Sequence, residues 1–250
     1  MLFGAVIQLT LLIWLSTKVV FMITMSLVGL TIFRSLVVIM EGYASNPYVR
    51  NVCRGRTMAM LPRRATGRFE DPPAADPVVV FHFGVRFNHP LGLLCPGGPQ
   101  ITRHFFQCLD EIQEQAEDYG LLGLSRWQSG DRGSQNTMMY VFYFRDLEGL
   151  ARFSQSDIHR DAWAWASRTN PKYIGFFHET FSVPRHAYET VYVNMPRTLL
   201  GDAMVCCEVD DADGQEEDRE WVRTLVDAGN SRLQTMWGRM GRVQRRRRRE

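Results

Sequence analysis

Histidines in two segments are candidates for proton transfer. His159 and Trp163 stand four residues apart in SDIHRDAW, so on a helix they share one face. A histidine beside an indole can relay a proton to or from a substrate held against the ring, which makes His159 a candidate catalytic residue and Trp163 a candidate substrate contact. Packing of both side chains between a helix and a sheet is the alternative, and the sequence leaves it open.

The second histidine lies in the run GFFHETF. In a strand, successive side chains point to opposite faces, so His178 and Thr180 lie on one side and Phe177, Glu179 and Phe181 on the other. If His178 points inward, it is a candidate base or a haem ligand. If Glu179 points inward, it is a candidate substrate-binding group, and a buried carboxylate there needs a partner such as Arg86 or Arg126. A structural ion pair is the competing interpretation.

A third group lies in the run VVVFHFGVRFN. His82, Gly84, Arg86 and Asn88 alternate with apolar residues and therefore share one face. In a closed barrel, Arg86 and Asn88 can bind an oxyanion formed on the substrate, whereas on an open sheet they simply face solvent. Trp127 and Tyr140 are candidate aromatic walls of the same site, although core packing is the commoner use of such rings.

Several other chemistries lack support in the sequence. No G-x-G-x-x-G, G-x-x-x-x-G-K-S/T or H-E-x-x-H pattern occurs, and the five cysteines lack the C-x-x-C spacing of a zinc site or a redox pair. We therefore predict no metal site and interpret the cysteines as reduced thiols, which favours a domain that faces the cytosol.

The middle of the chain alternates between strand-like and helix-like segments. Runs rich in Val, Phe and Tyr predict strands, helical periodicity follows the first strand, and Asp146 is placed to cap a later helix. The order strand, helix, strand, strand, helix, strand predicts an α+β fold, namely a ferredoxin-like βαββαβ domain over residues 78–202. One face of such a sheet stays exposed, so we expect a homodimer. The segments are 100–119 and 146–168 for helices, and Val78–Phe87, Leu121–Ser129, Thr137–Phe144, Tyr173–Val183 and Tyr188–Met195 for strands.

The N-terminal segment predicts a membrane anchor. From Leu2 to Met40 the formal charges are Lys18 and Arg34, and about 20 apolar residues suffice for a helix to cross a bilayer. Arginines follow between Arg50 and Arg68, so the domain should face the cytosol. We expect residues 1–42 to be a single-pass transmembrane anchor, of the endoplasmic reticulum, and residues 43–77 an irregular linker. Two crossings with a turn near Ser16, or a buried helix, are the alternatives.

The last segment, residues 203–250, is strongly charged. An acidic block spans Asp210 to Glu220, consecutive arginines close the sequence, and apolar residues between them, such as Trp221 and Leu225, recur at roughly helical steps. An amphipathic helix on anionic lipid and a disordered extension both fit this pattern. We expect no nucleic-acid binding from the arginine run.

Four blocks of the chain resemble a known family. The blocks VVVFHFGVRFN, VFYFRDLEGLARFSQSDIHRDAW, GFFHETFSV and YETVYVNMP together are similar to the fungal antibiotic-biosynthesis-type monooxygenase family, of the fumagillin-pathway kind, over roughly Arg54 to Asp202. The resemblance implies a dimeric α/β-barrel that inserts oxygen into a secondary metabolite. It also implies a reaction without metal or flavin, in which dioxygen is the co-substrate and the substrate supplies the electrons.

Three functions follow from these observations. The first is a membrane-anchored monooxygenase that oxidises an apolar small molecule, a terpenoid or polyketide intermediate, in an apolar chamber enclosed by sheet and helices. The second is a haem-dependent dehydratase or lyase of similar fold, with His178 or His159 as the axial ligand. The third is a membrane-tethered module that binds a ligand without catalysis.

Overall fold

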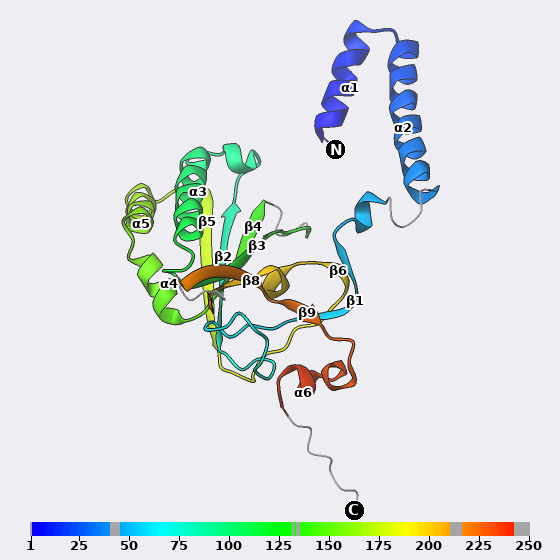
Figure 1. Ribbon diagram of the computed structural model, residues 1–250. Helices are drawn as coiled ribbons and strands as arrows, with labels where there is room; N and C mark the ends of the chain where they lie inside the picture. Colours follow the sequence, from blue (N-terminus) through cyan, green and yellow to red (C-terminus); the bar gives the residue numbers. More distant parts are fainter. Residues whose placement is uncertain (1, 41–45, 132, 134–135, 211–216, 243–250) are drawn as a thin grey trace, which may run out of the picture. The chain divides into compact units, whose positions relative to one another are not determined.

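A computed structural model describes residues 2–40, 46–131, 133, 136–210 and 217–242. The chain forms two compact units, Met1–Val52 and Cys53–Glu250 (Figure 1). Each unit has its own arrangement of elements.

The N-terminal unit is a pair of apolar helices, α1 (Leu2–Trp14) and α2 (Thr17–Met40), followed by a short 3-10 turn, Pro47–Val49. The chain breaks between the helices at the position expected for a turn, where the amide of Val20 donates to the carbonyl oxygen of Ser16 at 3.2 Å. At about 1.5 Å per residue, α2 is about 36 Å long and α1 about 20 Å. Only α2 is therefore long enough, among the described residues, to cross a hydrocarbon core.

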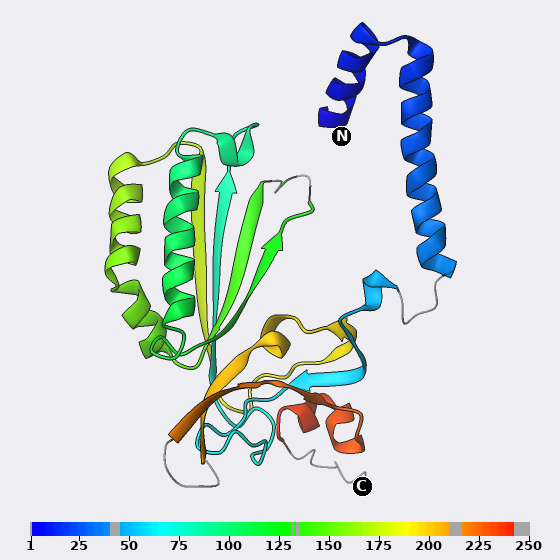
Figure 2. The ribbon, with the colours of Figure 1, turned by 45° about the horizontal axis from the view of Figure 1, so that its top comes forward.

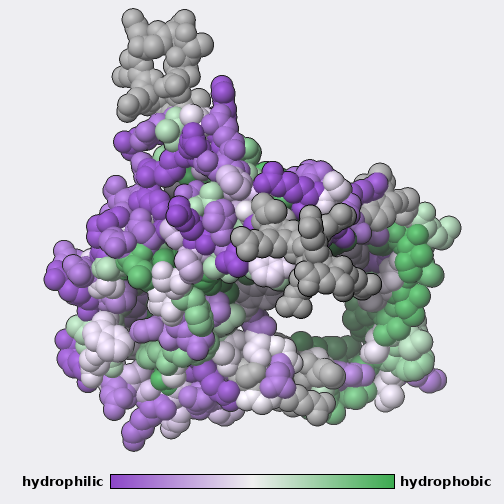
Figure 3. Space-filling view, turned by 90° about the horizontal axis from the view of Figure 1, so that it is seen from below, coloured by the Kyte–Doolittle hydropathy of each residue, from purple (hydrophilic) through white to green (hydrophobic). Residues whose placement is uncertain are grey.

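The apolar side chains of α2 are not packed inside a core. None of its most apolar stretch is buried inside the structure, and Figure 3 shows the helices of this unit as an almost continuous apolar surface. Within the described residues of this unit, α2 therefore exposes its apolar side chains, which does not match the interpretation of residues 1–40 as a buried helix.

The second unit is built on a four-stranded antiparallel sheet in the order β3-β4-β2-β5. Two helical segments connect its strands, α3 after β2, and α4 with α5 after β4. Figure 2 shows α3 and α5 side by side along the same face of the sheet. This order confirms the predicted α+β, ferredoxin-like βαββαβ fold. The bounds are β2 Val78–Phe87, α3 Gly98–Glu114, β3 Leu121–Gln128, β4 Thr137–Phe144, α4 Leu147–Ser154, α5 Asp157–Thr169 and β5 Ile174–Val183.

Aromatic and aliphatic side chains fill the space between the helices and the sheet. The odd-numbered residues of β2 face the helices, and their partners on β4 are even-numbered, as in the pair Phe83 and Tyr140. Phe105 of α3 stacks on Phe83 with ring centroids 5.7 Å apart and contacts Tyr140 at 4.7 Å. The even-numbered residues of β2 point to the opposite face of the sheet, hereafter the open face.

Local side-chain bonds fix where the helices begin. The carboxylate of Asp146 accepts from the amide of Gly149 at 2.7 Å, which confirms the predicted cap of α4. The hydroxyl of Ser156 accepts from the amide of His159 and donates to Glu111 on α3 at 2.9 Å. One serine therefore both caps α5 and ties it to α3.

The described parts of the predicted linker and tail contain strands, and the interpretation of these segments as irregular, or as partly disordered or amphipathic, is wrong at those strands. A strand from the linker, β1, lies between β6 and β9 in a second sheet, and β7 pairs with β8 in a two-stranded ribbon. Val205, Cys206 and Cys207 of β7 are buried, and Glu208 after them is exposed. Charged residues at the ends of this ribbon are the reason that the sequence alone did not suggest a strand here. The bounds are β1 Val52–Ala59, β6 Tyr192–Pro196, β7 Met204–Asp210, β8 Glu217–Arg223 and β9 Leu225–Asp227.

The helical periodicity inferred for the tail is wrong at Trp221 and Leu225, which lie in β8 and β9. Thr57 of β1 pairs with Asp227 of β9, so one of the two neighbours of β1 in its sheet comes from near the other end of the sequence. In the described part of this segment, Met236–Arg239 forms an α-helix, α6, and Ser231–Gln234 forms a 3-10 turn before it. The terminal arginine run and residues 211–216 of the acidic block lie outside the described residues.

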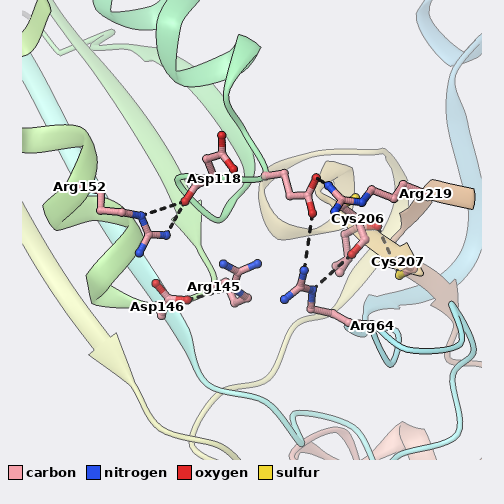
Figure 4. A network of polar contacts seen from close by, with 10 residues as sticks. Arg64, Asp118, Arg145, Asp146, Arg152, Cys206, Cys207 and Arg219 are labelled. Atoms are coloured by element: carbon pink, nitrogen blue, oxygen red, sulfur yellow. Dashed lines mark hydrogen bonds and ion pairs between the residues drawn. The ribbon is translucent and has the colours of Figure 1, made fainter. Parts of the chain in front are cut away.

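Polar contacts made by three arginines hold these C-terminal elements in place. Arg219 of β8 donates to Glu117, just after α3, at 2.7 Å, while Arg64 approaches the same carboxylate at 3.9 Å and donates to the carbonyl of Cys206 at 3.4 Å (Figure 4). Further along, Arg239 is buried and donates to Glu189 at 2.5 Å.

Candidate functional site

The open face of the four-stranded sheet carries an imidazole and a carboxylate side by side. His82 of β2 pairs directly with Glu179 of β5, and their side chains share this face. Nδ1 of His82 lies 3.8 Å from Oε2 of Glu179, with the two side chains 28% and 63% exposed. The ring of Phe181 contacts His82 edge-on at 5.6 Å. The imidazole and the carboxylate are therefore both accessible to solvent, and they lie next to an aromatic ring.

An apolar row crosses the open face next to this pair. It consists of Trp127 on β3, Met139 on β4, Gly84 on β2 and Phe177 on β5, which the strand register brings into line. A Cβ atom at Gly84 would overlap the ring of Phe177, so the absence of a side chain at Gly84 allows this ring to lie flat on the strand. Trp127 and Phe177 are 44% and 40% exposed.

Arg86 stands on the same face, beyond the apolar row. Its Nε donates to Oδ1 of Asn88 at 2.9 Å, and its Nη2 donates to the carbonyl of Gly133 at 2.8 Å. These two bonds fix the direction of the guanidinium while leaving the side chain exposed. A fixed, accessible cation is a suitable group to stabilise negative charge on a bound molecule.

The opposite half of the open face is closed by the chain after β6. The amide of Leu199 donates to the hydroxyl of Ser125 at 3.1 Å, and the backbone of Ala203 lies 3.0 Å from where a Cβ of Gly123 would stand. Burial under this segment raises the pKa of Tyr143 to about 12. The accessible part of the open face is therefore the half that carries His82, Glu179, Arg86 and Trp127.

The expected apolar chamber between helices and sheet is not present among the described residues, because aromatic rings occupy that space. Tyr140 is 7% exposed and belongs to this packed core, so its ring packs between the sheet and α3 and does not line the open face. His178 points to the helix side of β5, where its ring contacts Phe81 at 5.7 Å, but this edge of the sheet is exposed. Two hollows among the described residues lie along the apolar helices instead, one on α2 and one on α1.

The two candidates on α5 are separate from the open face. The Nδ1 atom of His159 lies 2.9 Å from the carbonyl oxygen of Ser154, and its ring packs edge-on against Phe153 at 5.3 Å. Trp163 is 66% exposed on the outer side of the helix layer. His159 therefore has a structural position at the junction of α4 and α5.

The structure thus divides the residues expected from the sequence. It brings Arg86, Asn88, Trp127 and Glu179 to one face, and it places Tyr140, His178, His159 and Trp163 elsewhere. The partner of Glu179 is His82, neither Arg86 nor Arg126. The sequence placed His82 on the same face as Arg86, but the cross-strand register that sets it opposite Glu179 depends on the fold.

The haem alternative requires an imidazole beside a hollow large enough for a porphyrin. Neither His178 nor His159 borders one of the hollows found, and Nδ1 of His159 is engaged by Ser154. In the described residues both imidazoles pack on a phenylalanine ring, His178 on Phe81 and His159 on Phe153. Within the same residues, no cluster of three or more His, Cys, Asp or Glu side chains is arranged to hold a metal ion.

Comparisons with known proteins identify close relatives of this chain. Residues 78–200 match the family described as monooxygenase af470-like. The chain is 35% identical over 198 residues to monooxygenase af470 of Aspergillus fumigatus, a match that covers 79% of this chain and 70% of the relative.

Two solved structures are more distantly similar. An aldoxime dehydratase shares 19% identity with a TM-score of 0.40, over 55% of this chain and 33% of that one. A cofactor-independent oxygenase, SnoaB of Streptomyces nogalater, shares 15% identity with a TM-score of 0.30, over 43% of this chain and 92% of that one. At these TM-scores the similarity adds nothing to the topology described above.

Proposed function

The chain belongs to the monooxygenase af470-like family, and we propose that it is a membrane-anchored monooxygenase acting on an apolar terpenoid or polyketide intermediate at the open face. Membership confirms the family and the monooxygenase class predicted from the sequence. We place the site on the open face because His82 pairs there with Glu179, beside exposed aromatic rings.

The residues of the open face suit a reaction that starts with removal of a proton. His82 accepts a proton from an acidic C–H bond of the substrate, one adjacent to a carbonyl or an enol, and the carboxylate of Glu179 stabilises the imidazolium that forms. Arg86, held by Asn88, stabilises the negative charge left on the substrate oxygen. Trp127 and Phe177 provide the apolar surface on which such a substrate lies.

The oxidation then needs no external reductant. The carbanion gives two electrons to dioxygen and forms a carbon–oxygen bond, and the resulting peroxide loses water to leave a carbonyl group. In balance, a CH₂ group and O₂ become a C=O group and H₂O, so the substrate is the only electron donor. This scheme retains the prediction of a reaction without metal or flavin.

A second copy of the chain is the proposed cover of the open face. Trp127, Phe177 and Phe181 are each at least 40% exposed there, and contiguous exposed apolar side chains mark interaction surfaces. A homodimer formed through this face excludes water from His82. Light scattering of the full chain in detergent should give twice the chain mass, and Phe181→Glu should halve it; a monomeric unsubstituted chain would contradict the dimer.

We place α2 across a membrane, with the catalytic domain on the cytosolic side of the endoplasmic reticulum. Lys18 and Arg34 stand sixteen positions apart, about 24 Å along the helix, so both charges can reach the headgroups from opposite ends of the hydrocarbon core. Arg50, Arg54 and Arg56 follow α2 in the sequence. Protease digestion of intact microsomes should remove the domain; full protection of the domain would contradict this orientation.

The activity is tested with ¹⁸O₂ and the full chain reconstituted into lipid vesicles. Terpenoid and polyketide candidates that carry an acidic C–H bond should acquire one labelled oxygen atom. His82→Gln and Glu179→Gln should abolish labelling, whereas His104→Gln, a histidine that packs on Trp165 in the helix layer, should not.

Each contrary outcome points to a different correction. No labelling with any candidate would contradict the substrate class. Labelling that survives His82→Gln but disappears in His178→Gln would move the site to the helix side of β5. A Soret band in the spectrum of the purified protein would overturn the cofactor-free scheme in favour of haem chemistry.

A further inference from the structure

One end of the four-stranded sheet presents leucines to solvent. At this end β2 and β3 finish and β4 and β5 begin, and the loop of residues 88–97 connects β2 to α3. Leu91, Leu93 and Leu94 in this loop are 61%, 44% and 75% exposed. We name residues 88–97 the leucine loop. Three exposed leucines within four residues are an unusual concentration of apolar surface for a loop.

The leucine loop is well anchored to the domain. Cys95 is only 1% exposed and packs in a small core with Phe87 and Ile174. The amide of Gly92 donates to His89 and the amide of Cys95 donates to Gly92, each at 3.0 Å. A Cβ at Gly98 would overlap the backbone of Leu93, so the loop packs tightly on the start of α3. The fold therefore holds the leucines outward.

Positive charge surrounds this loop. In the described parts of residues 86–104, 126–137 and 165–175, which converge on this end of the sheet, five side chains are cationic and one, Asp131, is acidic. Tyr173 adds an exposed aromatic ring, which packs against the ring of His89 at 4.8 Å. The five cations are Arg86, Arg103, Arg126, Arg168 and Lys172.

We infer that the leucine loop inserts into the surface of an anionic lipid bilayer. Leucine side chains gain free energy on leaving water, Tyr and Trp rings favour the level of the headgroups, and nearby Lys and Arg side chains are attracted by anionic lipid. The loop provides all three in one place. This contact belongs to the folded domain and is distinct from α2: it needs neither the oxygenase chemistry nor a particular substrate.

A reporter in the loop tests the contact in the full chain. An environment-sensitive fluorescent amino acid replaces Leu94, and in a control protein it replaces Leu147, a 45% exposed leucine at the start of α4, beyond the other end of β4. Both proteins are reconstituted into phosphatidylcholine vesicles with and without phosphatidylserine, using acyl chains brominated as quenchers. We expect a blue shift and quenching at position 94 that increase with phosphatidylserine, and neither at position 147.

A second substitution tests whether the quenching by lipid depends on the leucines of the loop. Leu91→Ser in the Leu94 reporter protein should lose most of the quenching without changing the melting temperature, because Leu91 is exposed. Equal quenching at positions 94 and 147, or none at 94, would overturn the proposal. A blue shift that depends on protein concentration in detergent and is insensitive to brominated lipid would show instead that a second copy covers the loop.

The result is separable from the anchor and the activity. If α2 does not cross the bilayer, alkaline carbonate extracts the protein from the pelleted vesicles, whereas a chain that spans the bilayer stays in the pellet, whatever the reporter shows. If the oxygenase proposal fails, the labelling assay is negative while the lipid quenching is unchanged.

Discussion

Substitution of Arg239 tests whether the C-terminal segment is an integral part of the domain. Arg239 is 8% exposed, and its guanidinium donates to Glu189 at 2.5 Å and to the carbonyls of Leu233 and Gln234 at 2.9 and 3.0 Å. Arg239→Met keeps an apolar stem of similar length but removes all three bonds. It leaves the carboxylate of Glu189 without its buried partner.

The size of the effect follows from burial. Removal of one partner of a buried ion pair destabilises by about 3–5 kcal/mol, because a charge is left uncompensated. The Glu189 side chain is still 23% exposed, so water can reach it and the cost should lie near about 3 kcal/mol. For a domain of about 200 residues, each kcal/mol shifts the melting temperature by about 2–4 °C, so the expected decrease is about 6–12 °C.

Thermal unfolding of the full chain in detergent, followed by near-ultraviolet circular dichroism, measures this shift. Arg232→Met is the matched control, since Arg232 is exposed in the same segment, and it should change stability by no more than about 0.5 kcal/mol. Adding Glu189→Gln to Arg239→Met should restore part of the loss, because the unpaired charge is then removed. A decrease for Arg239→Met no larger than that for Arg232→Met would refute the reasoning.

Two further substitutions test the helix layer by thermal unfolding. Gly149→Ala should destabilise by about 1–3 kcal/mol, because its Cβ would overlap the backbone carbonyl of Tyr119, whereas Gly130→Ala, with nothing within 4 Å, should be nearly neutral; equal effects would contradict the packing of α4. Burial alone raises the pKa of Asp146, but the amide of Gly149 and the guanidinium of Arg145 outweigh it and lower the pKa below its ordinary value. The stability that the carboxylate supplies is therefore present above about pH 4 and lost as the pH falls through the lowered pKa. Asp146→Asn should accordingly be less stable than the original chain at pH 6 and equally stable near pH 2, and a stability difference that does not vary with pH would contradict the charge effect.

Local sequence patterns predicted most of the sheet. The alternation in VVVFHFGVRF gave the bounds of β2, the run TMMYVFYF gave β4, and Asp146 marked the start of α4, because these features depend on neighbouring residues. The parity of each strand also placed His82 with Arg86, and His178 opposite Glu179. Parity does not say which side the helices cover, so the sequence left open whether these rows line a core or an open face.

Pairings between distant segments could not be predicted in the same way. β1 is hydrogen-bonded to β9 from the other end of the chain, and neither segment has a strong strand pattern of its own because arginine and aspartate occupy its solvated side. The same holds for β7 and β8, whose charges suggested a disordered tail. Their strand conformation depends on partners that only the folded chain supplies.

The sequence by itself determined the apolar α2, the order of strands and helices, and the residue types available for chemistry, since each follows from a period of two or 3.6 along adjacent residues. Tertiary structure alone decided that His82 meets Glu179, that aromatic rings fill the space beneath the helices, and that Arg239 holds the C-terminal segment. These contacts join residues far apart in the chain, and their energies depend on distance and burial in space, neither of which is encoded in the spacing along the chain.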